Sequence, residues 1–137
     1  MLPEEAKTAD VRAWLSKAET DIRSAEHAMK APSPILEDTV FHCQQTAEKS
    51  LKAFLTWHDA PFRKTHSIEE LGRQCTGIDA NLGSLIDQAV PLTEYAWRFR
   101  YPGEPVSPTQ REAEDALQVA KSVYGAVVER LPEEARP

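Results

Sequence analysis

The chain has 137 residues, a length that suits one domain with a single hydrophobic core. Hydrophobic residues make up 41% and charged residues 28%, which is typical of a globular protein and excludes a disordered one. The formal net charge of −6 excludes a general attraction to nucleic acid, so any contact with RNA or DNA requires a local cluster of Arg and Lys.

Neither end of the chain nor its cysteines indicate a special environment. The first residues, MLPEEAKTAD, lack the regions of a signal peptide, and no apolar run approaches the roughly 20 residues of a membrane span. We therefore expect a cytoplasmic protein without membrane contact. Cys43 and Cys75 match neither a zinc spacing nor a disulfide framework, so we expect buried, reduced thiols, no metal and no cofactor.

The first predicted helix covers residues 9–31. Its apolar residues recur at spacings of three and four and fall in an arc of roughly 120°, as a core-facing stripe does. Charged residues, Asp21 among them, occupy the rest of the circumference, and Thr8 or Asp10 can cap the start. The APSP sequence that follows ends the helix because proline lacks a backbone N–H. The apolar stripe consists of Val11, Trp14, Leu15, Ala18, Ile22, Ala25 and Met29.

The second predicted helix covers residues 35–58 and has an equally regular apolar face. Gln44 falls inside the apolar arc, so we expect it to need a hydrogen-bond partner. The sequence Asp59-Ala60-Pro61 ends the helix. The inner face consists of Leu36, Val40, Cys43, Ala47, Leu51, Phe54 and Leu55.

Two less regular helices are predicted next, at residues 67–76 and 80–99. Ser67 and Glu70 form a capping box that begins the first of them, and the sequence TGID ends it at residue 76. Pro91 lies inside the second helix and should kink or split it. The prolines of the following segment mark an irregular loop.

The last predicted helix covers residues 108–131, with Ser107 as N-cap, Pro108 at the first position and Gln110 completing a capping box. Strand-like alternation is absent from the sequence. Because short connections favour antiparallel neighbours, the sequence predicts an all-α, antiparallel up-down bundle of four to five helices. It forms a single domain over residues 1–137 with a core at about 9–131. The last apolar stripe consists of Ala113, Ala116, Leu117, Ala120, Val123, Tyr124, Val127 and Leu131.

The loop before the third helix provides the first candidate site. Arg63, Lys64 and His66 lie beside a helix N-terminus, whose free N–H groups favour anions. The alternative is an ordinary basic loop in which His66 is a neighbour of the Ser67 cap.

The sequence YAWRFRYP, residues 95–102, extends this candidate site. Its arginines, Arg98 and Arg100, can grip a phosphate, and Trp97 or Tyr101 can stack on a base. The alternative is that the aromatic rings pack a helix end while the guanidinium groups pair with carboxylates.

A second candidate site lies on the second helix. His42, Gln45, Lys49 and Lys52 follow helical spacing and form one polar stripe away from the predicted core face, which can bind a phosphate or a partner's carboxylates. The alternative is a solvated helix face that carries an ordinary Glu48–Lys52 pair.

Some aromatic residues remain outside the predicted core stripes. Aromatic side chains bury roughly 150–250 Å² each and are enriched at interfaces, so we expect a twofold homodimer that uses one or more of them. The alternative is that they close the ends of the monomer core. These residues are Trp57, Phe62, Trp97 and Phe99.

The sequence resembles the HEPN domain family of prokaryotes from about Asp10 to Leu131, and the pattern FHxQQxAEKxLKA is its specific part. The resemblance implies a dimeric helical bundle, often paired with a minimal nucleotidyltransferase, with roles in nucleotide or RNA binding or metal-independent RNA cleavage. Four segments carry it, in this order: Trp14–Ala25 (WLSKAETDIRSA), Phe41–Leu55 (FHCQQTAEKSLKAFL), His66–Leu71 and Arg100–Pro102.

The catalytic branches of that family carry an Arg followed, after four to six residues, by a His. Here Arg23 precedes His27 with three residues between them, Arg63 precedes His66 with two, and no histidine follows residue 66. The motif is absent, so the sequence favours a non-catalytic module that binds a nucleotide, RNA or a nucleotidyltransferase partner. The alternative is a divergent, toxin-like ribonuclease that assembles Arg98, Arg100 and His66 from separate segments.

Overall fold

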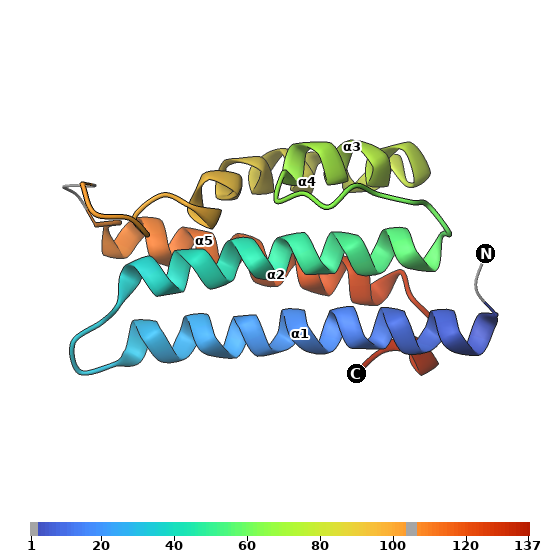
Figure 1. Ribbon diagram of the computed structural model, residues 1–137, viewed down its shortest axis with the longest axis horizontal. Coiled ribbons are helices and arrows are strands. Elements are labelled where there is room, and N and C mark those ends of the chain that lie inside the picture. Colours follow the sequence, from blue (N-terminus) through green and yellow to red (C-terminus); the bar gives the residue numbers. More distant parts are fainter. Residues whose placement is uncertain (1–2, 104–106) are drawn as a thin grey trace.

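Three long helices form the body of the molecule in the computed structural model, which describes residues 3–103 and 107–137 (Figure 1). They are α1 (Glu4–Lys30), α2 (Leu36–Trp57) and α5 (Gln110–Glu129). The described residues contain helices, turns and loops but no strand, which confirms the predicted all-α fold.

Shorter helices cover the side of α2 that faces away from α1 (Figure 1). They are α3 (Ile68–Ile78), the 3-10 helix η1 (Ala80–Leu82), α4 (Gly83–Ala89) and the 3-10 helix η2 (Val90–Ala96). A last 3-10 turn, η3 (Glu133–Ala135), follows α5. No helix of the described chain is long and apolar enough to cross a membrane.

The direction of the helices departs in one detail from the expected alternation. α1 and α2 are antiparallel, but the segment 58–67 runs back along α2, so α3 begins near the middle of α2 and runs in its direction (Figure 1). Contacts from Gln44 to the carbonyl of His66 (3.1 Å) and from Cys75 Sγ to the carbonyl of Leu51 (3.8 Å) show this parallel course. α5 also runs in the direction of α2.

α2 is the central helix and is enclosed on most sides. Its apolar face holds fully buried residues such as Val40 and Leu55, as predicted, and burial raises the pKa of both Cys43 and Cys75 to about 12. The polar side of α2 is enclosed as well, because α1 covers part of it and the loop before α3 covers another part. The buried polar residues of α2 are Thr39, Gln44, Thr46, Glu48, Ser50 and Lys52.

Two hydroxyl groups connect α2 to α1. Thr39 Oγ1 donates to the carbonyl of Ala25 at 3.0 Å, and Thr46 Oγ1 donates to the carbonyl of Ala18 at 3.3 Å. Ala18 and Ala25 are fully buried, and their small side chains allow the two backbones to approach closely enough for these bonds.

The helix ends differ from the predicted ones at both ends of the chain. α1 begins at Glu4 rather than residue 9, because acidic residues in the first turn suit the positive end of the helix dipole; Thr8 therefore lies inside the helix. The capping box of α5 uses Thr109 and Glu112 instead of Ser107 and Gln110, with hydrogen bonds of 3.0 and 2.9 Å.

The region predicted as a helix at residues 80–99 that is kinked or split by Pro91 consists of three short elements followed by turns, and the predicted break at Pro91 is confirmed. Pro91 lies at the start of η2, where its missing N–H ends the regular pattern of α4. The third helix continues to Ile78, beyond its predicted end, and Asp79 then caps η1 and pairs with Arg130 at 2.7 Å.

Candidate functional site

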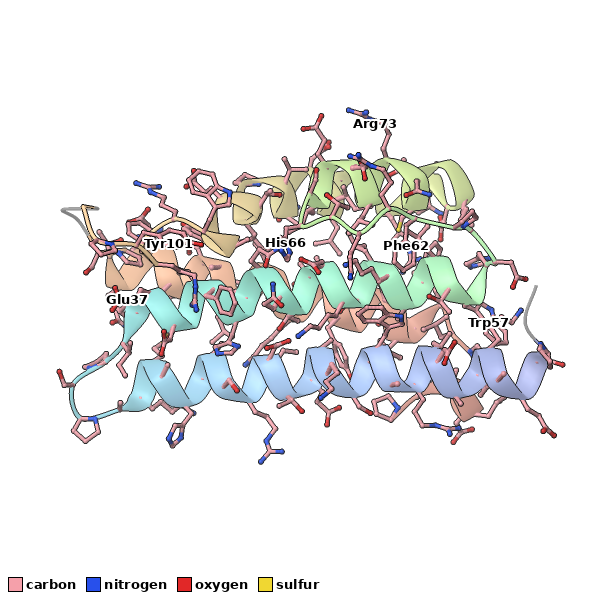
Figure 2. The ribbon with its side chains drawn as sticks, viewed as in Figure 1. Glu37, Trp57, Phe62, His66, Arg73 and Tyr101 are labelled. Carbon is pink, nitrogen blue, oxygen red and sulfur yellow. The ribbon has the colours of Figure 1, made fainter. Side chains whose placement is uncertain are left out.

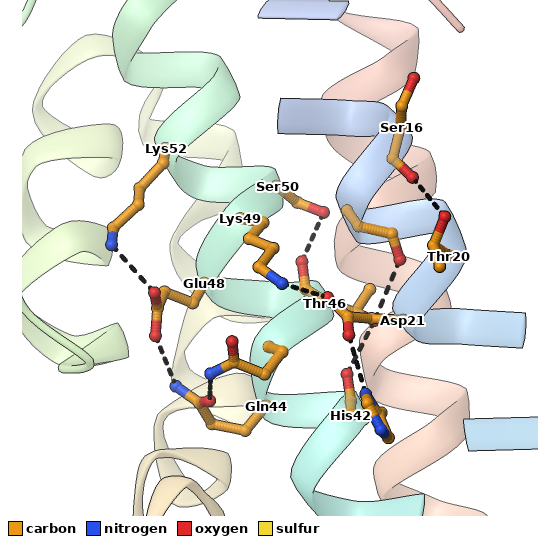
Figure 3. A network of polar contacts seen from close by, with 12 residues as sticks. Ser16, Thr20, Asp21, His42, Gln44, Thr46, Glu48, Lys49, Ser50 and Lys52 are labelled. Carbon is orange, nitrogen blue, oxygen red and sulfur yellow. Dashed lines mark hydrogen bonds and ion pairs between the residues drawn. The ribbon is translucent and has the colours of Figure 1, made fainter. Parts of the chain in front are cut away.

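Two clusters of polar side chains flank α2, and each joins a buried carboxylate to a histidine and a lysine. Figure 3 shows Asp21 with His42 and Lys49, and Glu48 with Gln44 and Lys52. The Glu48 cluster lies between α2 and the loop before α3, and consists of Gln44, Glu48, Lys52 and His66. The Asp21 cluster lies between α1 and α2, and consists of Asp21, His42 and Lys49.

Glu48 is the centre of the first cluster, with a side chain only 5% exposed. Its Oε2 accepts from Lys52 Nζ at 2.9 Å, and its Oε1 accepts from Gln44 Nε2 at 3.1 Å and contacts His66 Nδ1 at 2.8 Å. Burial opposes ionisation, but the hydrogen bonds from Lys52, His66 and Gln44 outweigh it and hold the pKa of Glu48 below its ordinary value. Glu48 is therefore ionised at neutral pH.

His66 differs from the rest of its cluster because its side chain is 68% exposed. An ionised carboxylate can only accept hydrogen bonds, so His66 Nδ1 carries the hydrogen that points to Glu48 and Nε2 lies on the opposite, outer edge of the ring. The main chain at His66 is held in place as well, because Gln44 Nε2 donates to the carbonyl of His66 at 3.1 Å. The imidazole is thus a solvent-accessible group in a defined orientation (Figure 2).

Lys52 is buried, contrary to the solvated stripe predicted for His42, Gln45, Lys49 and Lys52. Its side chain is 8% exposed, and its ammonium group lies 5.5 Å from the Trp14 ring centre and 5.8 Å from that of Phe62. These aromatic faces and Glu48 replace the water that an ammonium group ordinarily binds. The amide group of Gln45 also has a partner within the protein, because its Nε2 donates a hydrogen bond to Gln44 Oε1 at 2.7 Å.

The other two residues of that predicted stripe belong to the Asp21 cluster. Asp21, 9% exposed, accepts from Lys49 Nζ at 2.6 Å and contacts His42 Nδ1 at 2.8 Å. Both partners are partly open to solvent, at 22% and 29%. His42 also borders a shallow groove of about 620 Å³ between α1 and α2, which Arg23, His27 and other residues line.

The turn at residues 97–101 holds the predicted aromatic and arginine residues apart. Phe99 has a φ of 69°, in the left-handed region that disfavours a bulky residue, and its buried ring stacks on Tyr95 at 6.2 Å. The packing of Phe99 therefore maintains an unfavourable backbone conformation, which directs the flanking arginines to different neighbours. Arg98 pairs with Glu94 at 2.6 Å, which raises the pKa of Arg98.

Arg100 lies over the ring of Phe41 on α2, 3.9 Å from its centroid, and is exposed. Two aromatic residues of the same turn, Trp97 and Tyr101, are 54% and 69% exposed. Of the four aromatics expected at an interface, only Trp97 offers such a surface, because Phe99 is buried and Trp57 and Phe62 pack against the core.

The predicted site residues share one side of α2 but do not form a single pocket. Arg100 contacts Phe41, seven residues before Glu48, so Arg100 and His66 are separated by on the order of 10 Å along the helix. Figure 2 places His66 between Tyr101 and Phe62 along α2. Lys64 is exposed, beside this surface.

The helix end expected to bind an anion is largely satisfied by protein groups. Ser67 Oγ accepts the N–H of Glu70 at 3.1 Å, and Thr93 Oγ1 accepts that of Ile68 at 3.1 Å. Arg63 makes two hydrogen bonds to Glu70, of 3.1 and 2.5 Å, so its guanidinium group is already paired. The N-terminus of α3 therefore does not supply the row of free donors that the sequence suggested.

Sequence reasoning named the Glu48–Lys52 pair, which the structure contains, but it missed the burial of Glu48 and of Asp21, although signals for both exist. Asp21 follows Ala18 by three residues and precedes Ala25 by four, which places it beside the apolar stripe of α1. Glu48 lies four residues after Gln44, the polar residue correctly expected to need a partner. A polar residue inside an apolar arc indicates that its helical neighbours are also enclosed.

The model of one protein family, the HEPN domain, matches residues 11–131. The chain belongs to the HEPN domain family. This match covers nearly the whole chain and confirms the family that the sequence resembles. No curated protein and no solved structure matches this HEPN domain. Family membership includes both ribonucleases and binding modules, so the function must be argued from the side chains.

Proposed function

We propose that this HEPN domain is a non-catalytic binding module that holds single-stranded RNA along α2, between Arg100 and His66. The observation that carries the proposal is Arg100: its exposed guanidinium group lies over the ring of Phe41, and the next residue in the chain, Tyr101, is 69% exposed. Aromatic rings that stack on bases beside a cation that holds the backbone are the usual elements of single-strand binding.

The charges near this surface support a focused site. The net charge of −6 repels RNA overall, and Arg63 and Arg98 are paired with carboxylates. Arg100 and Lys64 are exposed and have no ion-pair partner among the described residues. We assign them as the cations of the proposed site. Because Arg100 and His66 lie on the order of 10 Å apart along α2, a ligand that contacts both extends beyond one phosphate, which favours an oligonucleotide over a mononucleotide.

The non-catalytic assignment rests on the arrangement of Arg and His. Cleavage of RNA without a metal requires both groups at the same phosphate, the arginine to stabilise charge and the histidine to transfer a proton. The sequence lacks the spacing that places them together, and Arg100 and His66 contact different turns of α2. The arrangement therefore supports binding along a strand.

Fluorescence anisotropy with a labelled RNA hexamer, at low and moderate salt, tests the proposal. Arg100→Ala/Tyr101→Ala should weaken binding at least tenfold, since one charged contact and one stacked base each contribute roughly 1–3 kcal/mol. Arg111→Ala on α5, where the guanidinium group is 86% exposed, is the matched control and should bind like wild type. Equal affinity of the double variant and the control would contradict the proposal. Absence of RNA binding would instead favour recognition of a nucleotidyltransferase partner.

One observation favours the second candidate function, a divergent ribonuclease. Glu48 orients the exposed imidazole of His66 in the way that a carboxylate orients a catalytic histidine. Incubation of the hexamer with the protein in the presence of a chelator, followed by chromatography, distinguishes the two functions. Intact RNA supports the binding module, whereas cleavage that is lost in His66→Ala supports the ribonuclease.

We also propose that the domain forms a homodimer through the surface around Trp97. An indole that is 54% exposed gains burial when a second copy covers it. Sedimentation at micromolar concentration should give the mass of a dimer, and Trp97→Ser should shift it to the monomer. A monomeric wild-type protein would exclude the dimer.

A further inference from the structure

We propose that Glu48 is a positioning residue that makes His66 a proton-gated contact for RNA phosphodiesters, so that this HEPN domain binds RNA more tightly as the pH falls from about 8 to about 6. The inference rests on the proposed function, because it assigns a role to one end of the same surface. It concerns how the surface recognises a phosphate, which Arg100 alone does not determine.

The first step of the argument is the orientation of the ring. His66 Nδ1 lies 2.8 Å from the Oε1 of Glu48, a carboxylate 5% exposed and fixed by Lys52 at 2.9 Å and Gln44 at 3.1 Å. The Gln44 amide also holds the main-chain carbonyl of His66. Both the ring and its backbone are therefore fixed by one buried group, while the ring itself remains 68% exposed.

The second step is the hydrogen-bonding character of Nε2. Because Nδ1–H is committed to Glu48, the neutral ring presents at Nε2 a lone pair, which repels a phosphate oxygen. After protonation Nε2 carries a hydrogen and donates to the same oxygen with the added strength of a charge. An unrestrained neutral ring could place its single hydrogen on Nε2 and donate to the phosphate without being protonated. The carboxylate of Glu48 prevents this by holding the hydrogen on Nδ1.

The third step is the charge around the ring. Glu48 and Lys52 on α2 compensate each other, so protonation of His66 leaves the cluster with one positive charge. On the loop, Lys64 adds a second positive charge without an ion-pair partner among the described residues. The carboxylates of neighbouring elements are already paired, in Glu69–Arg73 and Glu70–Arg63 from α3 and Glu94–Arg98 from η2.

The orientation can be tested without ligand. Two-bond nitrogen–proton NMR spectra of the histidines at pH 8 should show His66 as the Nδ1–H tautomer in the wild-type protein. In Glu48→Gln the His66 signals should move toward those of a free imidazole, which is a mixture of the two neutral tautomers. The signals of His27, an exposed residue of α1, should not change. A mixed tautomer of His66 in the wild-type protein would contradict the positioning role of Glu48.

The gating can be tested with the RNA trimer ApApA, whose ends are hydroxyl groups. Its diester phosphates do not titrate between pH 6 and 8, so a change in affinity reports on the protein. The dissociation constant should be about tenfold lower at pH 6 than at pH 8, as one charge-assisted hydrogen bond provides. His66→Gln should lose this dependence, Glu48→Gln should reduce it because the neutral ring can then also present an N–H, and the control His27→Gln should keep it.

The outcomes separate the inference from the proposed function. Binding of ApApA with equal affinity at both pH values, or a pH dependence that persists in His66→Gln, overturns the inference and leaves the proposed function intact. No binding at either pH overturns both. If Glu48→Gln does not fold, as circular dichroism would show, the exposed variant His66→Gln decides the gating, and the tautomer of the wild-type protein decides the positioning.

Discussion

The Asp21 and Glu48 clusters each join a carboxylate, a histidine and a lysine, but the surroundings of the two clusters differ. In each, a carboxylate that is less than a tenth exposed contacts a histidine Nδ1 at 2.8 Å and a lysine within 3 Å. In the Asp21 cluster both partners are partly exposed, whereas in the Glu48 cluster the lysine is buried and the histidine is open. The Asp21 cluster joins two helices along their length; the Glu48 cluster fixes one loop on α2.

This difference supports a packing role for the Asp21 cluster and the proposed binding role for the Glu48 cluster. The lysine and histidine of the Asp21 cluster can each exchange the carboxylate for water, so the cluster contributes modestly to stability. The Glu48 cluster contains a buried ion pair that stabilises little by itself but is costly to break. It also directs one polar edge of His66 outward. The arrangement suits a group that must stay fixed while a ligand binds.

The largest expected effect is the removal of the Glu48 carboxylate. Glu48→Ala leaves the ammonium group of Lys52 buried without its partner, which should lower the free energy of unfolding by about 3–5 kcal/mol. Urea denaturation followed by circular dichroism measures this change. Glu48→Ala/Lys52→Met, which removes both charges, should recover a large part of the loss. If the double variant is as unstable as the single one, the cost lies in packing and not in the unpaired charge.

The corresponding change in the Asp21 cluster should cost less. Asp21→Asn should lower the free energy of unfolding by about 1–2 kcal/mol, because Lys49 and His42 can turn toward water. The same urea experiment provides the comparison. A loss as large as that of Glu48→Ala would show that the two clusters are energetically equivalent despite their different exposure.

Acid should lower the stability of the folded protein through protonation of Glu48. Its pKa in the folded protein lies below the ordinary value of 4.5, so its ionised form contributes stability above that value, which is lost as the pH falls through the lower, folded-state pKa. Thermal unfolding between about pH 5 and pH 3 should therefore show a smaller loss of stability in Glu48→Gln than in the wild-type protein. Parallel curves for the two proteins would contradict this assignment.

The smallest expected effects are those of the histidines on stability. His66→Gln should change the free energy of unfolding by no more than about 0.5 kcal/mol, since its side chain is mostly exposed, and His42→Gln by about 1 kcal/mol. Thermal melts at pH 7 measure both. A strongly destabilised His66→Gln would mean that His66 serves the fold, which would weaken the case for a binding role.

Much of the fold follows from the sequence because long amphipathic stripes determine it. The stripes of α1, α2 and α5 contain Val11, Val40 and Val123, all buried as predicted. The region around Pro91 was predicted less well, since short 3-10 turns depend on tertiary contacts such as the bond from Ile68 N–H to Thr93. The direction of α3 was also not predictable, because it depends on how the segment 58–67 packs on α2.

The site was harder to predict for a related reason. A helical wheel divides residues into an inner and an outer face, but α2 is covered from several sides, so Lys52 and Glu48 are buried on its predicted outer face. The pairing of Arg63 with Glu70 and of Arg98 with Glu94 removed two predicted ligand groups. The segments 63–66 and 97–101, which the sequence singled out, carry exposed residues such as His66, Arg100 and Tyr101. Their role in binding stays a prediction.

The hydroxyl contacts between α1 and α2 determine the axial register of the two helices. Ala18 and Ala25 are seven residues apart, as are Thr39 and Thr46, so both bonds form together in this register, and a slip of one helical turn, about 5.4 Å, would break both. Such a slip would leave both threonines opposite the wrong carbonyls and move Asp21 away from its partners. Two ordinary hydroxyl groups thus favour this alignment over a slipped one, and the polar surface on α2 depends on it for its geometry.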